Sequence, residues 1–505
     1  MGFNKKINLG ITKITINISC QPFFESKNVI VFGYPINFNK SLINFSNLEF
    51  GNTVKGHWLK IDLSEDAVNV TTDILGGFRV YYCQIDNEII ISDDYKCILS
   101  HYNKKPVLNV IEYDFWLKHG FTTGQSTFVD NLLKVSPACT LILKDNLAVE
   151  ESYFLNKERT PDITLHKNLI HQDLLNTFKN IKDSNKKVIL FFSGGKDSCL
   201  LLQYLISLKI PFTPVFLKLN PISRFGADDI EKVRAISKEL NIDLDEIEIK
   251  LSQVTKQEKE DIVSNQIFDK HYSLLHYLGY REIRKKYSEK CLIINGQSSD
   301  SILSFGPSEN SLMSYFRREI MYKPNTLVSK LGLLLLIFKT KRVFKLPKLD
   351  LERLTALFDE YKYTRVIDKT RSKAYLFYLD KYILKKTKHL TSFSSKEMYV
   401  KILSFSQGSD NQVVVNSSKK YNIDTIMPFA TPEIIYSTIK YKNESLEIKK
   451  PKYVIDNILK DEFSFFYDEL DLNNVDTKDL IINQNNEYSD EMESLFLKNS
   501  KKIIN

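Results

Sequence analysis

One short stretch, Val188–Ser198, constrains the fold of this chain more than any other. It begins with the apolar run Val188–Phe192, which is typical of a short buried strand, and it then turns at adjacent glycines. From Ser198 to Leu208 apolar side chains recur at helical spacing, so the turn leads directly into a helix. A strand, a tight turn and a helix in this order predict one unit of an α/β sheet.

The turn has the residue types that bind an anion. Gly194 and Gly195 let the backbone approach a ligand closely, and the first amides of the helix have no partner inside it. The helix dipole adds positive potential at the same point. Ser193 and Ser198 contribute hydroxyl donors, and Asp197 contributes a carboxylate suited to a Mg²⁺ ion that bridges phosphate oxygens.

The turn is not a G-x-x-x-x-G-K-[ST] loop, because its two glycines are adjacent. Its sequence from Ser193 to Ser198, SGGKDS, instead resembles the PP-loop of ATP pyrophosphatases. That resemblance implies that ATP is held by its pyrophosphate and cleaved between the α and β phosphates. The nucleotide-binding residues would be Ser193, Gly194, Gly195, Lys196 and Ser198. The alternative is an ordinary turn between a strand and a helix.

Length and charge set the broad class. A chain of 505 residues is too long for one core and predicts two or three domains. Its 43% hydrophobic and 26% charged residues describe a soluble globular protein. The formal charge of +8 is modest, and the lysine-rich segments 339–345 and 449–452 are short. We therefore interpret them as solvated faces and expect no nucleic-acid partner.

The six cysteines are scattered without a CxxC pair, which favours reduced thiols and a cytoplasmic protein. No apolar signal-peptide core follows Met1. The most hydrophobic run, Leu331–Phe338, is too short to span a bilayer, so we expect a core or partner-facing helix there and no membrane partner.

Four domain segments are expected: a β-rich domain at 1–150, a linker and helix at 151–185, an α/β domain at 186–472 and a polar tail at 473–505. In the first, period-two patterns with β-branched residues predict strands. The clearest are Ile14–Ile18, Val29–Phe32, Glu88–Ser92 and Thr140–Leu143. The segment 166–181 predicts an amphipathic helix, and the tail lacks clear periodicity, so we expect loose structure there.

After the SGGKDS turn, predicted strands at 212–218, 244–249 and 291–294 alternate with helical patterns, which favours a parallel sheet. The last strand ends in a second polar turn, Asn295–Ser301, at the same edge. This turn would set Asp300 opposite Asp197, so that the two carboxylates share Mg²⁺. The alternative is a plain solvated turn.

Beyond residue 310 the pattern becomes helical. Helices are predicted at 313–318, 327–338, 351–361, 375–386 and 396–405, with further apolar segments at 427–436 and 452–459.

The order of these parts resembles the asparagine synthetase family. Asn295–Asp300 is similar to the family's second loop, usually SGEGxDE, and Met427-Pro428-Phe429 is similar to its VPFLD segment. The resemblance covers roughly Asn8 to Leu459. It implies an α/β fold plus a β-rich N-terminal domain: stacked β-sheets like those of Ntn hydrolases, then a parallel-sheet PP-loop synthetase domain with helical additions.

The resemblance also implies a reaction. ATP would adenylate a small-molecule or peptide carboxylate, pyrophosphate would leave, and an amine would attack to form an amide. Asp197 and Asp300 would bind Mg²⁺ and act in catalysis with Gln297, while Gly296 and Leu217 would lie against the nucleotide. Leu217 would read adenine through backbone groups.

The sequence departs from the family at several positions. A working glutaminase domain has Cys after the initiator Met, whereas position 2 is Gly here, so we expect no glutamine hydrolysis. Lasso-peptide cyclases and carbapenam synthetase share that loss, and β-lactam synthetase is a close relative in reaction type; this points to a specialised product such as a macrolactam peptide. Gln297 stands where the family has glutamate. The family's R-x-K lysine is not found after Leu459, which leaves Lys460, Lys478 and Lys196 as candidates.

Two alternatives stay open. One is amidation of a sugar carboxylate in surface-polysaccharide synthesis, with ammonia, a partner glutaminase or another partner enzyme as the amine source. The other is a non-catalytic nucleotide-binding pseudoenzyme.

Overall fold

The computed structural model describes residues 2–102, 105–144, 147–154, 163–220, 224–271, 274–287, 289–303, 326–339, 373–390, 393–404, 406–440, 452–465 and 486–504. The helices predicted at 313–318 and 351–361, and Lys478, lie outside these residues.

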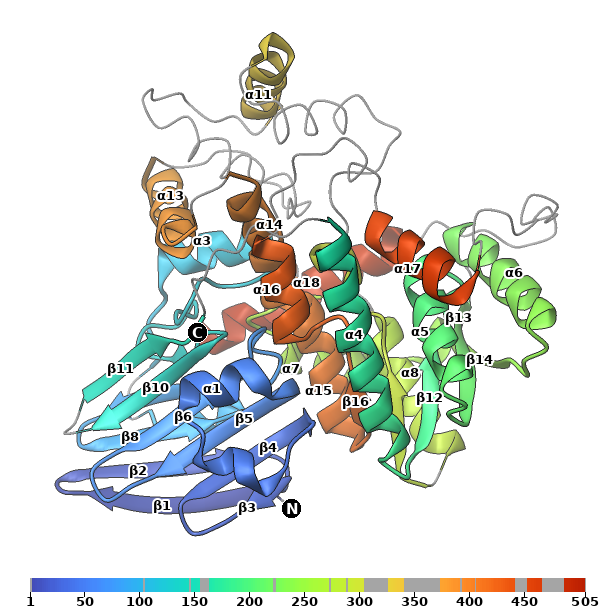
Figure 1. Cartoon of the computed structure of the whole chain (residues 1–505). Helices are drawn as coiled ribbons and strands as arrows, with labels where there is room; N and C mark the ends of the chain where they lie inside the picture. Colours follow the sequence, from blue (N-terminus) through green and yellow to red (C-terminus); the bar gives the residue numbers. More distant parts are fainter. Residues whose placement is uncertain are drawn as a thin grey trace.

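The N-terminal part contains two β-sheets, drawn in blue and cyan in Figure 1. The first has the order β1 (Phe3–Leu9), β2 (Thr12–Ile18), β8 (Glu88–Ser92), β7 (Tyr81–Ile85), β9 (Leu133–Lys134). The second has the order β11 (Leu147–Ser152), β10 (Cys139–Lys144), β6 (Val68–Thr72), β5 (Lys55–Leu63), β4 (Val29–Ile36), β3 (Phe24–Glu25). The four strands predicted in this part are therefore confirmed.

The two sheets face each other across one buried core. Ile16 and Ile91 from the first sheet share a cluster with Phe32 and Leu59 from the second, as alternating strands with one inward face require. Four short helices join these strands: η1 (Lys40–Asn44), α1 (Asn47–Thr53), α2 (Tyr95–Leu99) and α3 (Val110–His119).

A parallel five-stranded sheet forms the centre of the second part. Its order is β14 (Asp245–Lys250), β13 (Phe212–Asn220), β12 (Lys187–Phe191), β15 (Cys291–Ile294), β16 (Asp424–Ile426). Short connections η2 (Leu251–Gln253) and α9 (Ser299–Ile302) follow β14 and β15, and the longer helices are α4 (Ile163–Lys182), α5 (Lys196–Ser207), α6 (Arg224–Glu239), α7 (Lys256–Asn265) and α8 (Leu274–Lys286). The predicted parallel sheet is confirmed, and the fold is a mixed α/β fold with a β-rich N-terminal part.

The strand order places a reversal of direction at the centre of the sheet. β12 comes first in the chain; β13 and β14 add on one side of it, while β15 and β16 add on the other. The loops that leave β12 and β15 therefore run apart at the carboxyl edge of the sheet. In open α/β sheets this opening is where ligands bind.

The remaining helices follow in the C-terminal third. They are α11 (Leu327–Lys339), α13 (Lys373–Thr387), α14 (Phe393–Ser404), the π-helical turn η3 (Ser406–Asp410), α15 (Asn411–Tyr421), α16 (Pro432–Lys440), α17 (Tyr453–Phe463) and α18 (Asn486–Ile504). No helix among the described residues is both long and apolar enough to cross a membrane.

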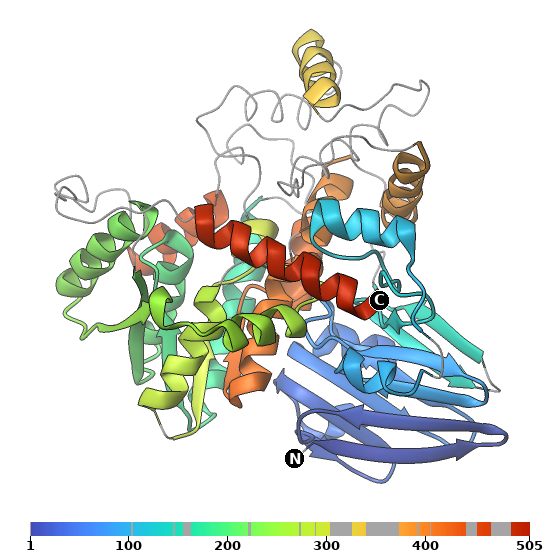
Figure 2. The ribbon, with the colours of Figure 1, turned by 180° about the vertical axis from the view of Figure 1, so that it is seen from behind.

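The expectation of loose structure throughout the tail is wrong for its last part. Helix α18 packs across α7, visible in red in Figure 2, and it buries Met492 and Phe496. These two residues and Leu495 lie at i, i+3 and i+4, which is a single helical face. The surrounding polar residues hide this short apolar pattern in the sequence.

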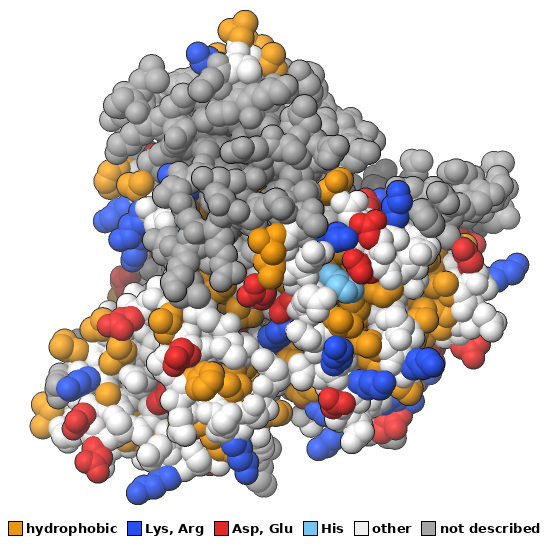
Figure 3. Space-filling model, in the orientation of Figure 1, with side chains coloured by type: hydrophobic (Ala, Val, Ile, Leu, Met, Phe, Trp, Pro, Cys, Tyr) orange, Lys and Arg blue, Asp and Glu red, His pale blue; other side chains and the backbone are white. Residues whose placement is uncertain are grey.

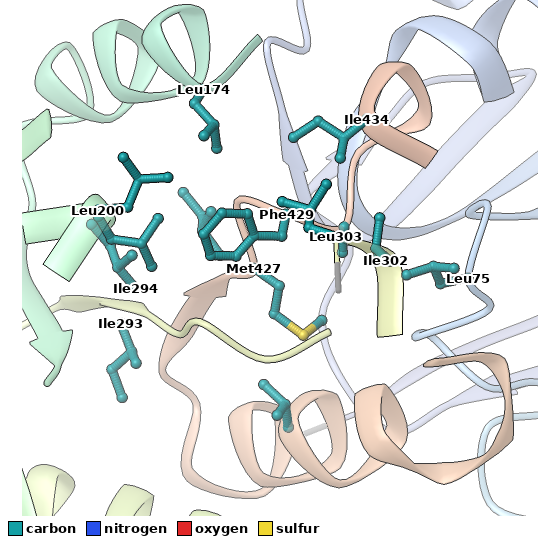
Figure 4. Close-up of a cluster of buried hydrophobic side chains, with 14 of the residues drawn as sticks. Leu75, Leu174, Leu200, Ile293, Ile294, Ile302, Leu303, Met427, Phe429 and Ile434 are labelled. Atoms are coloured by element: carbon teal, nitrogen blue, oxygen red, sulfur yellow. The ribbon is translucent and has the colours of Figure 1, made fainter. Parts of the chain in front are cut away.

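The two parts of the chain share a core. Figure 4 shows Leu75 of the β-rich part beside Ile302 and Leu303 of the α/β part, within one cluster of buried side chains. A second contact joins the two parts: the guanidinium of Arg79 donates two hydrogen bonds of 3.1 Å to the carboxylate of Asp269, and both side chains are buried. The β-rich part is thus held to the α/β part by apolar contact and by a buried ion pair.

Candidate active site

The loop after β12 has the backbone shape that its glycines predicted. Gly194 has a φ of +72°, and a Cβ atom there would lie 2.9 Å from Cγ2 of Val233 on α6. Only glycine meets both conditions without strain. Gly195 follows as the N-cap of α5 and makes no side-chain hydrogen bond to that helix. The N-cap side chain therefore leaves the first amides of α5 to other partners, and such amides are a common anion site.

Two hydroxyl groups border these amides. Oγ of Ser198 donates to the carbonyl of Gly195 at 2.9 Å and lies 3.3 Å from Oγ of Ser193. Ser198 is buried, whereas Ser193 is exposed at the rim of the loop. The Ser193 hydroxyl is thus oriented by Ser198 and accessible to a ligand.

The two aspartates predicted to converge do lie together, around a lysine that the sequence did not single out. Nζ of Lys452 is 2.7 Å from Oδ2 of Asp197 and 3.0 Å from Oδ1 of Asp300. Lys452 immediately precedes α17 and has a left-handed backbone, with a φ of +63°. One ammonium group therefore bridges the loops after β12 and β15.

Burial and ion pairing act in opposite directions on these side chains. Burial has the larger effect on Asp197. It raises the pKa of Asp197; Lys452 opposes that shift, and Asp300 adds to it. The same two carboxylates raise the pKa of Lys452 against the effect of its own burial. The lysine is therefore fully charged at neutral pH.

The carboxylates also fit a Mg²⁺ ion. Oδ1 of Asp197 is buried and has no hydrogen-bond partner in the described part of the chain, and the Asp300 side chain is 78% exposed. A hard cation takes oxygen ligands, and Mg²⁺ commonly uses one or two carboxylates together with phosphate oxygens and water. Within the described residues no group of three or more His, Cys, Asp or Glu side chains could hold a metal. The residues thus fit a Mg²⁺ that arrives with a phosphate ligand, not a closed protein site.

Lys196, like Lys452, links the SGGKDS loop to helix α17. Its Nζ lies 2.8 Å from Oδ1 of Asp456 on α17. Lys196 and Lys452 therefore tie the start of α5 to the start of α17.

The loop after β15 approaches the first loop closely. A Cβ atom on Gly296 would lie 3.8 Å from Cβ of Asp197, so a larger side chain would enter the space between the two loops. Ser298 follows with a φ of +73°, a conformation that costs energy for any residue except glycine. Its hydroxyl donates to Oδ1 of Asn411. That hydrogen bond helps to hold the strained turn.

Gln297 is placed by its own loop and by α8. Its backbone N–H donates to Oδ1 of Asn295 at 2.9 Å. Nδ1 of His276, in the first turn of α8, lies 3.4 Å from Nδ2 of the same asparagine. Burial lowers the pKa of His276 to about 4, against smaller opposing effects that include a hydrogen bond with the Gln297 side chain. A neutral imidazole therefore stands next to Gln297 at pH 7.

Leu217 lies in the part of β13 that extends past β12. The N–H of Phe192 donates to the carbonyl of Val215 at 2.9 Å, and this is where the pairing of β12 with β13 ends. Because backbone groups alternate sides along a strand, the N–H and C=O of Leu217 point in the same direction as those of Val215. The N–H and C=O of Leu217 therefore point sideways toward the end of β12, where the SGGKDS loop begins. The Leu217 side chain packs over Gly279, where a Cβ atom would be 2.4 Å from it.

The structure therefore brings together Asp197, Asp300, Gln297, Gly296 and the SGGKDS residues at one edge of the sheet. It adds Lys452, Asp456, Asn411 and His276, which the sequence did not predict. Lys460, one of the lysines considered, is exposed on the last turn of α17 and is not part of the bridge. A signal for Lys452 did exist: a cation directly before a helix opposes the helix dipole, and that placement calls for a local anionic partner.

Comparison with known proteins adds little to this picture. No protein-family model matches the chain, and no curated protein matches it. Among solved structures, one match is the U34-tRNA thiolase NcsA from Methanococcus maripaludis with its [4Fe-4S] cluster. It is 15% identical, the match covers 48% of this chain and 78% of that chain, and the TM-score is 0.18. A similarity this low supports no argument about function.

Proposed function

We propose that this protein is an ATP-dependent amide ligase of the asparagine synthetase type, which releases pyrophosphate and lacks glutaminase activity of its own. The observation that carries the proposal is the bridge from Asp197 through Lys452 to Asp300, at the central opening of a parallel sheet. Beside it lie the start of α5, whose N-cap makes no side-chain hydrogen bond, and the Ser193 hydroxyl. This combination offers amides, ammonium groups and carboxylates for a magnesium-bound triphosphate.

The reaction has two steps. An oxygen of the substrate carboxylate attacks the α-phosphorus of ATP, and the bond from that phosphorus to the oxygen bridging to the β-phosphorus breaks, releasing pyrophosphate. An amine nitrogen then attacks the acyl carbon, the bond from carbon to the AMP oxygen breaks, and the nitrogen loses one proton. The protein contributes position and charge: the α5 amides, Lys452 and Lys196 stabilise negative charge that develops on the departing pyrophosphate.

Asp197 and Asp300 would hold Mg²⁺, which neutralises phosphate charge when bound. On arrival of Mg²⁺ with the nucleotide, Lys452 would turn from the carboxylates to phosphate oxygens. The Leu217 backbone would lie against adenine, since its polar groups face the loop side of β13. Gln297 cannot take up a proton at neutral pH, so it would position the amine or acyl group by hydrogen bonding.

The β-rich part would be an Ntn-hydrolase-like domain without a working nucleophile. A Cβ atom on Gly2 would lie 2.7 Å from the carbonyl oxygen of Ile18, which leaves no room for a cysteine side chain. Burial raises the pKa of Cys20 to about 11, so that residue is a protonated thiol at neutral pH. The amine would then come from the substrate or from a partner enzyme. All six cysteines are free thiols, which fits the cytoplasm as the place of action.

ATP–pyrophosphate exchange tests the proposal. The full chain is incubated with Mg²⁺, ATP, labelled pyrophosphate and a small-molecule and peptide extract of the source cells. We expect exchange that is lost in Asp197→Asn and retained in Asp461→Asn, because Asp461 lies on α17 but pairs with Lys167 instead. Mass spectrometry of the products then distinguishes a macrolactam peptide from an amidated sugar. Tight Mg·ATP binding without exchange in any extract would contradict the ligase and favour a nucleotide-binding pseudoenzyme.

A further inference from the structure

Helix α11 turns four leucine side chains toward solvent. Leu327 is 79% exposed and Leu331 is 51% exposed, while Ser329 on the same helix is buried. Leu334 and Leu335 are exposed as well, so the exposed leucines lie at i, i+4, i+7 and i+8 and form one stripe. A polar residue inside and leucines outside is the reverse of the pattern on a surface helix. We call this exposed stripe the leucine face. Its apolar surface is of the kind that a partner covers.

The leucine face stands at one end of the molecule. In Figures 1 and 2 α11 lies clear of the other labelled helices and of all three sheets, and the two views agree on this position. Figure 3 shows its hydrophobic side chains at the top of the molecule, with a basic side chain next to them. A flat partner could therefore reach the leucine face without meeting the rest of the described chain.

The sequence around α11 carries the positive charge of the whole protein. Residues 317–348 contain nine lysines and arginines and one glutamate, a formal charge of +8. The complete chain also has a formal charge of +8, so the other residues sum to zero. Lys330 and Lys339 belong to α11 itself, and Lys330 is exposed. The charge is thus concentrated in sequence around one apolar helix.

The apolar side chains and the concentrated positive charge together indicate which class of partner fits this face. A nucleic acid would use the charge but not the leucines. A second copy of the same face would use the leucines, but the two copies would repel each other with +8 each. An anionic lipid bilayer uses both, because its interior takes up leucines and its headgroups attract lysines and arginines.

We propose that α11 docks this protein onto the surface of an anionic membrane, with the leucine face in the lipid and the exposed Lys330 against the headgroups. The helix has 13 residues, which at about 1.5 Å each span about 20 Å, less than the roughly 30 Å core of a bilayer. It therefore lies along the surface and does not cross. The expectation of no membrane partner rested on this length, which excludes a spanning helix but not a docked one.

Sedimentation of the full chain with lipid vesicles tests the proposal. One set of vesicles contains phosphatidylcholine alone, and the other contains equal parts of phosphatidylcholine and phosphatidylglycerol. We expect strong binding to the anionic vesicles that weakens steeply with added salt, and at least tenfold weaker binding to the neutral ones. Each basic residue near an anionic surface contributes about fivefold in affinity, so Lys330→Glu should lower binding by more than that factor.

Matched variants identify the helix. The double variant Leu331→Gln with Leu334→Gln should lower vesicle binding at least tenfold, because both side chains are exposed and their loss leaves the fold intact. Leu147→Gln is the control: that leucine is 64% exposed on β11 and belongs to no basic segment. All variants should keep the Mg·ATP affinity of the parent, which separates this proposal from the ligase reaction.

Three outcomes would overturn the proposal. The first is equal binding to neutral and anionic vesicles, and the second is no loss of vesicle binding in the double leucine variant. The third is absence of vesicle binding together with self-association that the double variant abolishes, which would assign the leucine face to a second copy of the chain.

Discussion

Lys452→Met removes one positive charge from between two carboxylates while keeping the length of the side chain. In the described site Lys196 and Lys452 stand against Asp197, Asp300 and Asp456, a formal charge of −1. The variant changes this to −2. A triphosphate would therefore lose one cationic partner and meet a more negative site.

The size of the effect follows from the contact that is lost. A hydrogen bond to a charged group contributes about 1.5–3 kcal/mol, which corresponds to roughly 10- to 150-fold in Kd for Mg·ATP. The variant should also lower the free energy of unfolding. Breaking a fully buried ion pair costs about 3–5 kcal/mol, and because Lys452 and Asp300 are partly exposed we expect about 1–3 kcal/mol here.

Titration calorimetry with Mg·ATP at neutral pH measures the first effect. The carboxylates raise the pKa of Lys452 above its ordinary 10.5, so its stabilising charge is fully present below that pH and is lost only as pH rises through the higher folded value. Lys460→Met is the control, since that lysine is exposed on the same helix. If Lys452→Met binds Mg·ATP as tightly as Lys460→Met, Lys452 does not contact the phosphates and the reasoning fails.

Three further predictions concern backbone strain, the buried ion pair and pH. Gly194→Ala should abolish Mg·ATP binding and lower the free energy of unfolding by about 1–3 kcal/mol, whereas Gly10→Ala, also at positive φ but with nothing within 4 Å of its Cβ, should keep binding. Arg79→Met should cost about 3–5 kcal/mol in urea unfolding, because Asp269 stays buried and keeps only the longer 3.8 Å contact with Lys134; a loss below 1 kcal/mol would show that the pair is dispensable. Burial lowers the pKa of His57 to about 4 from 6.5, so its neutral form stabilises the fold above pH 6.5, and that contribution is lost as pH falls toward 4. In His57→Leu, the free energy of unfolding should therefore change between pH 6.5 and pH 4 by about 3 kcal/mol less than it does in the parent protein.

The sheet was predictable because each of its strands is a short apolar run that ends in a turn. The strand predicted at 291–294 matches β15, and the strand predicted at 188–192 matches β12 within one residue. These central strands are buried on both faces, so their composition alone identifies them. Strand β16 was not predicted, because it has only three residues, Asp424–Ile426, which are too few to show a period.

The two loops of the site were also predictable, but their bridge was not. Each loop follows a recognisable strand, and parallel strands bring their carboxyl ends to one edge, which places Asp197 near Asp300. Lys452 comes from a distant helix whose position depends on the packing of α17 against α5. The position of Lys452 directly before a helix indicates an anionic partner, but it does not identify Asp197 or Asp300 as that partner.

Distance along the chain gives the bridge a consequence for synthesis. Asp197 and Lys452 are 255 residues apart in the sequence. Strand β15 also pairs on one edge with β16, where Leu292 lies opposite Asp424, so that edge stays unpaired until β16 has been made. At about 5–20 residues per second, the ribosome needs roughly 10 to 50 seconds to travel from the aspartate to the lysine. Throughout that interval the SGGKDS turn exists without its ammonium bridge. The newborn chain can therefore acquire a complete nucleotide site only after Lys452 has been translated.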